Sequence, residues 1–476
     1  MIKTLATRAA LYGIAPQISR IAGFFALPFI TAYLTPLDYG ISGTVGAYIG
    51  GVSALQYLGT NVVFSNAFFK SPSQYKWLWR QMHGFLCLWA FIYALILGSV
   101  LYVALPAEVP PDNRWTIILL CIVPAIIFDP TLSLTFRFYH LTFQASVLAI
   151  RTAITGLLTV ALNVYTIVYL KMGYMGWFWS IFLSNFINFL FFFYPIYFKH
   201  NLLPIFNFKW KTILASLKVS LPAMPHYYSS YLLQSSDRVV MNITGVRLQG
   251  VGLYNIASTF GGYFGSFSEA VGAAAGPMYL QLFRENTEQA NRKARQMTFL
   301  LQALFLLLSV SICIWMKEIF GLLVNNAELQ AAYPIAIILL MSFNYRPMYL
   351  AAINKLMFQE KTKALWKISL LAGVANVALN FVFLPIYGIF ASAVITFSTF
   401  MYAGYAGFYM KEFKESNRLN YKPTLWLQCT VVALVFSYYF VEMAVNVKLA
   451  FSFVLIIIVL SLFYVKVIKQ KVISFN

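Results

Sequence analysis

Six charged side chains lie inside long apolar stretches of the sequence, where a charge is costly unless it faces a cavity or a partner. They are Arg20, Asp129, Asp237, Arg238, Glu269 and Arg346. The guanidinium fork matches phosphate oxygens, so the three arginines are candidates to bind a phosphate-bearing molecule. The three acids are candidates to take up a proton or a sodium ion. All six could instead pair with one another and hold helices together.

Arg20 is the strongest candidate for a phosphate contact, because no acidic residue accompanies it within its own apolar stretch. With a helical rise of 1.5 Å per residue, Arg20 lies about 17 Å into that stretch, near the middle of a bilayer. Asp237 and Arg238 are adjacent, so their side chains are expected to point in different directions and not to pair.

The composition indicates that lipid surrounds most of this chain. Of its 476 residues, 61% are hydrophobic and 10% are charged, and the mean hydropathy is +0.73. A soluble chain of this length would need more polar surface to cover its core. Stretches of about 20 apolar residues cross a hydrocarbon core as helices. The short alternating segments typical of a β-barrel do not occur.

Fourteen stretches are expected to span the membrane, at 9–34, 40–67, 81–105, 115–138, 144–170, 174–198, 219–245, 251–281, 297–320, 332–353, 364–386, 388–410, 425–442 and 449–466. With the N-terminus in the cytoplasm, 26 of the 34 Lys and Arg residues fall in cytoplasmic segments, 5 in outer segments and 3 inside spans. This asymmetry is the positive-inside pattern. The net charge of +20 therefore reflects topology and indicates no nucleic-acid partner.

An internal repeat divides the chain into two sets of six spans. The tetrapeptide Val160–Asn163 recurs as Val377–Asn380, in the fifth span of each set. Because six is even, the two sets share one orientation in the membrane. We expect an N-terminal six-helix bundle at 1–198, a cytoplasmic linker at 199–218, a C-terminal six-helix bundle at 219–410, and an additional helix pair with a cytoplasmic tail at 411–476.

No catalytic constellation is present in the sequence. It has no phosphate-binding glycine loop with lysine, no HExxH pair and no nucleophile elbow, which excludes an ATP-driven pump within this chain. The four cysteines form no CxxC pair, so neither a metal site nor a disulfide framework is expected. The connections are short and leave no room for a separate active site. The sequence predicts a protein that is not an enzyme and has no cofactor.

Three segments at helix connections resemble those of the Wzx-type polysaccharide flippases. They are FITAYLTPLDYG at 29–40, DR at 237–238 with VGLY at 251–254, and NVALN at 376–380 with LPIYG at 384–388. These flippases belong to the polysaccharide transporter family of the multidrug/oligosaccharidyl-lipid/polysaccharide (MOP) exporter superfamily. The resemblance implies an all-α integral membrane fold of about 14 helices, with two six-helix bundles of the MATE/MOP type and a C-terminal helix pair. Asp38 and the LPIYG segment are expected at helix ends, with Asp38 as a cap.

The resemblance also implies a flippase for an undecaprenyl-pyrophosphate-linked oligosaccharide, such as an O-antigen or capsule repeat unit. The substrate would cross from the cytoplasmic to the periplasmic leaflet of the bacterial inner membrane by alternating access. The arginines of the six residues would bind this lipid-linked substrate, and the acids would gate the movement or couple it to a proton or sodium gradient. Membrane lipid and polysaccharide polymerase or assembly proteins are the candidate partners.

Other functions stay open at this point. A MATE-like drug or cation antiporter would favour acids over arginines in its cavity. A membrane polysaccharide polymerase would need a larger outer loop than any found here. A scaffold within a glycan-assembly complex would need no transport residues at all.

Overall fold

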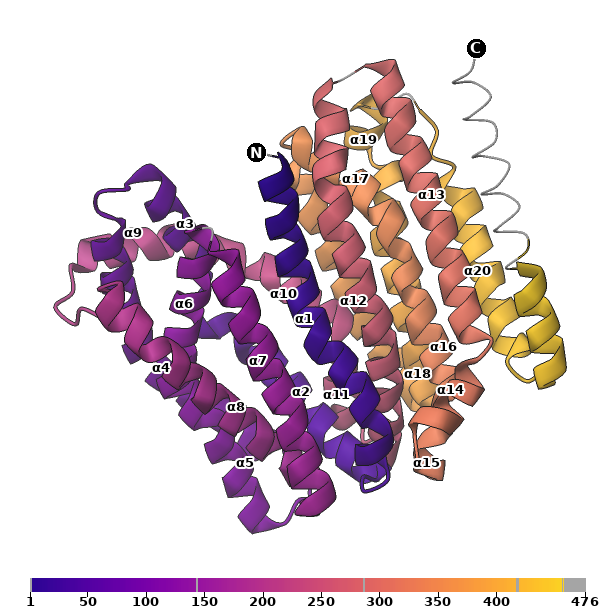
Figure 1. Cartoon of the computed structure of the whole chain (residues 1–476), viewed down its shortest axis with the longest axis horizontal. Coiled ribbons are helices and arrows are strands. Elements are labelled where there is room, and N and C mark those ends of the chain that lie inside the picture. The colour runs from indigo at the N-terminus through magenta and orange to yellow at the C-terminus, as the bar shows by residue number, and fades with distance from the viewer. Residues whose placement is uncertain (1, 143, 286, 417–418, 456, 458–476) are drawn as a thin grey trace.

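The structure is a computed structural model of the chain (Figure 1), and the residues described are all except 1, 143, 286, 417–418, 456 and 458–476. Their regular secondary structure is helical, and no strand occurs among them. Eight helices of this described part are long and apolar enough to cross a membrane. The prediction of an all-α membrane fold is confirmed.

The first bundle, α1 to α8, begins with the helix that carries Arg20. Its helices are α1 Ile2–Thr31, α2 Pro36–Gln56, α3 Asn61–Lys70, α4 Tyr75–Ala104, α5 Pro111–Val123, α6 Asp129–Leu141, α7 Ala145–Val164 and α8 Tyr174–Tyr194. A π-helical turn at Pro124–Phe128 joins α5 to α6, so that the two form one span. Within this bundle α1 packs along α7, and α2 packs along α4.

The linker helix α9 leads into the second bundle, α10 to α18, and then to a C-terminal helix pair. The helices are α9 Trp210–Ser220, α10 Met224–Gln234, α11 Ser236–Ile243, α12 Leu248–Glu285, α13 Glu288–Cys313, α14 Met316–Leu323, α15 Ala327–Gln330, α16 Tyr333–Ser342, α17 Arg346–Phe358, α18 Thr362–Tyr405, α19 Lys411–Ser416 and α20 Pro423–Phe440. The last described helix is Val445–Leu455, and the rest of the predicted span 449–466 lies outside the described residues. Helix α18 is interrupted at Gly388, where φ is +67°, so the two spans predicted on either side of this residue meet there.

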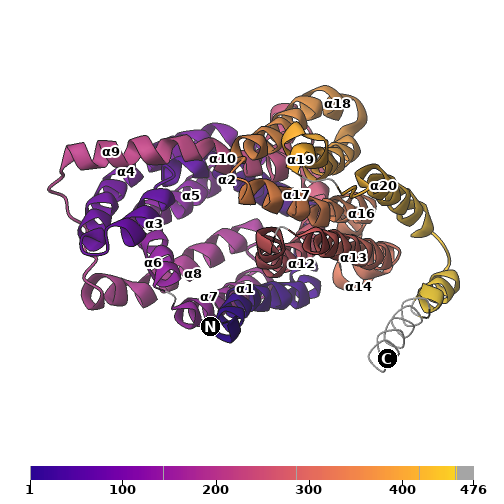
Figure 2. The same ribbon diagram turned by 90° about the horizontal axis from the view of Figure 1, so that it is seen from above.

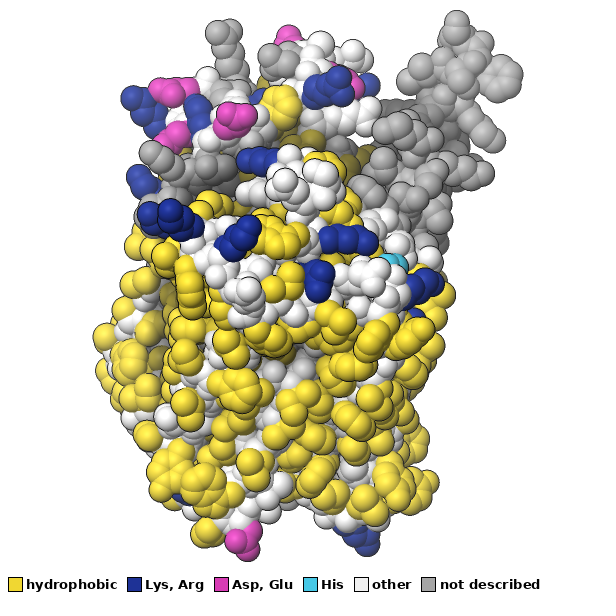
Figure 3. Space-filling model, turned by 90° about the vertical axis from the view of Figure 1, so that its left-hand side faces the viewer, with side chains coloured by type: hydrophobic (Ala, Val, Ile, Leu, Met, Phe, Trp, Pro, Cys, Tyr) yellow, Lys and Arg dark blue, Asp and Glu magenta, His cyan; other side chains and the backbone are white. Residues whose placement is uncertain are grey.

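The two bundles stand side by side in Figure 1, and Figure 2 shows them along the direction of the spans. Contacts between the bundles run mainly along α2 and α12, while α1 packs against both α7 and α12. Figure 3 shows hydrophobic side chains over most of one face, with Lys and Arg gathered above them. We call this upper end, which carries α3 and α9 in Figure 1, the basic end, and the opposite end, which carries α14 and α15, the far end.

The start of α2 corrects one prediction. The N-cap of α2 is Thr35, whose hydroxyl accepts a hydrogen bond from the Asp38 N–H at 3.3 Å, while Asp38 Oδ2 accepts one from the Thr35 N–H at 2.7 Å. Asp38 is therefore the third-residue partner in a capping box and not the cap itself, because its carboxylate reaches back to the preceding turn. Its Oδ1 accepts a further bond from the Tyr174 N–H at 2.9 Å, which joins the beginnings of α2 and α8.

Ion pairs at the far end hold the C-terminal helix pair to the second bundle. Lys448 is fully buried, and its Nζ lies 2.6 Å from Glu318 Oε1 on α14. Lys317 Nζ lies 2.7 Å from Glu442 Oε2, after the end of α20. The helix pair is thus attached to α14 by charges as well as by apolar packing.

Candidate functional site

Arg20 and Glu269 form an ion pair between the two bundles. Arg20 lies on α1 and Glu269 on α12, with Arg20 Nη1 3.9 Å from Glu269 Oε2. Their side chains remain 42% and 64% exposed, so the protein encloses neither charge. Exposed pairs of this kind contribute at most about 1 kcal/mol. The pair can therefore open to a ligand at little cost.

Arg346, on α17, lies beside the next turn of α12. Its guanidinium lies against Gly272, one helical turn after Glu269, where a Cβ would be 3.4 Å from Arg346 Nη2. Arg346 Nη1 donates to the Tyr345 hydroxyl at 3.3 Å, while the buried Nε has no hydrogen-bond partner among the described residues. Two guanidinium groups therefore lie along successive turns of α12: Arg20 at ion-pair distance from Glu269, and Arg346 one turn farther on with an unused donor.

Asp237 and Arg238 contact each other, so the prediction that these neighbours do not pair is wrong. Asp237 Oδ1 accepts hydrogen bonds from the Arg238 N–H at 2.8 Å and from Arg238 Nη1 at 3.4 Å. The physical reason is their place in the first turn of α11, where backbone N–H groups lack helical partners and attract a carboxylate. Arg238 Nε also donates to Asn255 Oδ1 at 3.1 Å, which ties α11 to α12.

A polar network extends from Asp237 into the second bundle. The Tyr254 hydroxyl donates to Asp237 Oδ2 at 2.5 Å and lies 3.3 Å from Thr396 Oγ1. Asn376 Nδ2 donates to Thr396 Oγ1 at 3.4 Å and to Thr399 Oγ1 at 3.1 Å. The carboxylate and Thr396 border a cavity of about 200 Å³. Oxygen groups of this kind suit a proton or a hard cation.

Asp129 makes its described interactions within the first bundle. Its Oδ2 accepts a hydrogen bond from Gln56 Nε2 at 2.7 Å, and its backbone carbonyl accepts one from the Tyr57 hydroxyl at 3.4 Å. The residue borders a cavity of about 230 Å³ lined by α2, α4, α5 and α8. The three candidate acids are thus distributed: Asp129 in one bundle, Asp237 in the other, and Glu269 between the two.

Glycines on α2 bring the bundles together and were not among the predicted residues. A Cβ at Gly40 would lie 2.2 Å from the Leu248 carbonyl oxygen, and one at Gly50 would lie 3.2 Å from the Tyr231 ring. Only glycine permits such close approach of two helices. Gly40, Gly43 and Gly50 recur at helical spacing, so the signal was present in the sequence.

Hydrogen bonds also join the bundles at the far end. Asn325 Nδ2 donates to the Pro28 carbonyl at 2.8 Å, and the Asn325 N–H donates to Thr31 Oγ1 at 3.0 Å. Asn326 Nδ2 donates to the Leu34 carbonyl at 3.0 Å. Both asparagines lie between α14 and α15, so these bonds attach the end of α1 to the second bundle.

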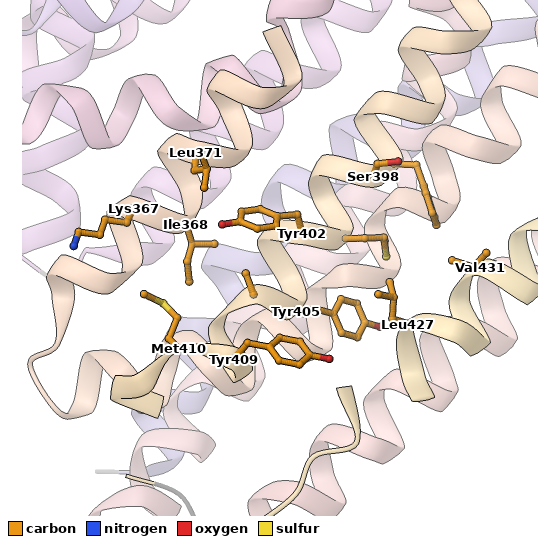
Figure 4. Close-up of a pocket in the computed structure, with 13 residues that line it drawn as sticks. Lys367, Ile368, Leu371, Ser398, Tyr402, Tyr405, Tyr409, Met410, Leu427 and Val431 are labelled. Atoms are coloured by element: carbon orange, nitrogen blue, oxygen red, sulfur yellow. The ribbon is translucent and has the colours of Figure 1, made fainter. Parts of the chain in front are cut away.

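An apolar groove lies beside α20 on the second bundle (Figure 4). It has a volume of about 680 Å³ and is formed by α18, the turn Ala406–Tyr409 and α20. Figure 4 shows the rings of Tyr402, Tyr405 and Tyr409 along it and Lys367 at one side. Its lining suits a hydrocarbon chain better than a charged ligand.

The fold is similar to several solved structures of transporters. No known family model and no curated protein matches this sequence. The lipid II flippase MurJ, in an inward closed conformation, has a TM-score of 0.73 at 15% identity, covering 96% of this chain and 99% of that one. A MATE transporter of Vibrio cholerae has a TM-score of 0.59 at 16% identity, covering 90% and 98%. An inward-facing MATE family transporter of the MOP superfamily has a TM-score of 0.53 at 16% identity, covering 88% and 96%.

The chain shares its fold with these solved transporters. At these identities the likeness concerns the fold alone. The match to MurJ covers 96% of this chain. The remaining 4% is shorter than the C-terminal helix pair, so at least part of that pair belongs to the shared fold. In the described part of the chain, no group of three or more His, Cys, Asp or Glu side chains is placed to hold a metal ion.

Proposed function

We propose that this protein is a flippase that moves an undecaprenyl-pyrophosphate-linked oligosaccharide across the bacterial inner membrane by alternating access. The observation that carries the proposal is the placement of two guanidinium groups along α12: Arg20 pairs with Glu269 between the bundles, and Arg346 lies one turn farther on against Gly272. A pyrophosphate would supply the negative charge and the acceptors that these two guanidinium groups lack. The glycan would be an O-antigen or capsule repeat unit.

The direction of movement follows from the charges at the two ends. The basic end would face the cytoplasm, in accordance with the positive-inside rule. The bundles are bonded together at the far end, so the substrate would enter from the basic end. The similarity in fold to a lipid II flippase supports a lipid-linked substrate. The groove beside α20 would hold part of its hydrocarbon chain.

Coupling to a proton or sodium gradient would occur at the candidate acids. Asp237 has hydroxyl and amide groups around it and a cavity beside it, which suits reversible binding of a small cation. Asp129 has a comparable cavity in the first bundle. Glu269 would gate the movement, because substrate and carboxylate would compete for Arg20.

Complementation of a deletion strain tests the proposal. Wild type, Arg20→Ala and Arg20→Lys are expressed at matched levels, and surface polysaccharide is measured together with lipid-linked repeat units held in the inner leaflet. We expect Arg20→Ala to lower surface polysaccharide at least about tenfold, as for a lost charged hydrogen bond of roughly 1.5–3 kcal/mol, with accumulation inside. Arg292→Ala, which breaks an exposed pair with Glu288, is the matched control and should have no effect.

Binding of undecaprenyl pyrophosphate to the purified protein separates a phosphate role for Arg20 from a structural one. Arg20→Ala should weaken this binding about tenfold. Glu269→Gln should retain or strengthen it, because the competing carboxylate is removed. Equal weakening by both variants would mean that the pair only holds α1 to α12. Normal surface glycan in the deletion strain, with no substituting flippase, would favour the MATE-like cation antiporter instead.

A further inference from the structure

The linker helix α9 runs across the spans and not along them. In Figure 1 it lies horizontally at the basic end, and in Figure 2, a view turned by 90°, its whole length is again in the plane of the picture. The segment before it is bonded to α4. Arg80 Nε donates to the Leu203 carbonyl at 2.7 Å, and the Ile205 N–H donates to the Arg80 carbonyl at 3.0 Å. Helix α9 is therefore held at a fixed level on the first bundle.

One side of α9 faces the first bundle, and a second side is apolar and exposed. Ile213 and Ser216 are buried on the bundle side. Trp210 and Leu214, one turn apart, are 58% and 55% exposed, and Leu221 follows on the same side at 44%. With 100° of rotation per residue, these three fall within an arc of about 40°. We call them the apolar stripe of α9.

Lysines stand beside this stripe and have no acidic partner among the residues that the structure describes. Lys211 and Lys218 are exposed, two turns apart, and Lys209 precedes the helix with its Nζ 5.0 Å from the centre of the Trp77 ring. Neither 61–84 nor 199–220 contains an Asp or Glu residue. Figure 3 faces this side of the molecule and shows Lys and Arg in a band along the upper margin of the hydrophobic surface. That margin is where the headgroups of a bilayer would lie.

We propose that α9 binds anionic phospholipid of the surrounding bilayer, with its apolar stripe in the boundary between headgroups and acyl chains and its lysines on the phosphates. A short helix with an apolar side and lysines next to it has the composition of an interfacial helix. Each lysine near an anionic surface strengthens binding about fivefold. Because Pro222 follows directly and α10 already packs on the second bundle, this contact would hold the first bundle at the membrane surface while the second one moves.

Fluorescence quenching in vesicles tests the proposal independently of transport. The four cysteines, Cys87, Cys121, Cys313 and Cys429, are replaced by alanine, and a fluorophore is attached to Leu214→Cys. The full-length protein is reconstituted in equal parts of phosphatidylcholine and phosphatidylglycerol, with the acyl chains of one or the other brominated. We expect brominated phosphatidylglycerol to quench the label severalfold more strongly than brominated phosphatidylcholine. Replacing Lys209, Lys211 and Lys218 by glutamine should abolish that difference.

Two further label positions serve as controls. Leu95→Cys, at a site 72% exposed within α4, should be quenched equally by both lipids in every variant, which also reports that the triple variant is inserted and folded. Ala215→Cys, on another side of α9, should be quenched little by either. Equal quenching at Leu214→Cys by the two lipids would overturn the proposal, as would equal access of aqueous iodide to labels at 214 and 215. Neither outcome depends on whether the protein is a flippase.

Discussion

The bundles meet differently at the two ends of the molecule. Toward the far end, side-chain amides donate across the interface: Asn255 Nδ2 to the Tyr39 carbonyl at 3.1 Å, and Asn242 Nδ2 to the Tyr48 hydroxyl at 3.1 Å. Farther toward the basic end, the interface includes the ring of Tyr231 against Gly50 and the exposed ion pair of Arg20 with Glu269. A hydrogen bond is directional and is lost when donor and acceptor move apart, whereas a ring on glycine and an exposed ion pair tolerate sliding.

This difference identifies the far end as the part of the interface that stabilises the observed arrangement. Each neutral hydrogen bond there contributes about 1 kcal/mol net, and the bonds share the same two helical surfaces. Separation of the bundles at the far end must break all of these hydrogen bonds. Changes at the far end should therefore shift the balance between open and closed forms more than equal changes near the basic end.

The largest effect is expected from a side chain at Gly252. A Cβ there would lie 1.8 Å from the Pro36 carbonyl oxygen, so Gly252→Leu forces α12 and α2 apart. We expect this substitution to destabilise the observed arrangement by about 3 kcal/mol, at the upper end for overpacking, and to abolish transport. The measurement is the distance between spin labels on the far ends of α5 and α13, which should increase. Gly46→Ala, on α2 with no neighbouring atom within 4 Å, should leave that distance unchanged. An unchanged distance in both variants would contradict the comparison.

A smaller effect is expected from one interbundle amide. Asn325→Ala removes the bond to the Pro28 carbonyl and should lower the population of the observed arrangement about fivefold, for a bond of about 1 kcal/mol. The same label pair measures this population. Gln330→Ala is the matched control, because its Nε2 bonds the Val324 carbonyl within the same bundle at 2.7 Å. If both variants shift the population equally, the interbundle bond has no special role.

The smallest effect is expected at a far-end contact that does not cross between the bundles. Hydrogen bonds from Lys317 and Tyr333 hold the pKa of the Glu442 carboxyl below its ordinary value. The folded pKa is lowered, so the contribution of this carboxylate is present above its ordinary pKa of about 4.3 and is lost as the pH falls below it. The melting temperatures of wild type and Glu442→Gln should differ slightly at pH 7 and converge in acid. The label distance between the bundles should not respond, and a response would mean that the helix pair takes part in closure.

The all-α membrane fold could be predicted because lipid imposes a simple rule on sequence: apolar stretches with basic residues on alternate connections. The predicted spans 40–67 and 219–245 are each interrupted in the structure, at residues 57–60 and at Ser235. The break in α18 was placed correctly, since Gly388 separates two predicted spans.

The pairing of Arg20 with Glu269 could not be predicted, because it depends on how α1 and α12 are placed in space. The prediction that Asp237 and Arg238 do not pair was wrong because it assumed the side-chain directions of a helix interior. Both residues lie in the first turn of α11.

The ion pair between fully buried Lys448 and partly exposed Glu318 also has a fixed order along the chain. Glu318 enters the membrane region 130 residues before its partner exists, and Lys448 alone would be costly to leave in lipid. Because the Glu318 side chain is partly exposed, water can solvate it until the last helices arrive, and Lys448 is then buried against a carboxylate already in place. The group that tolerates water is thus made first, and the group that requires a partner is made last.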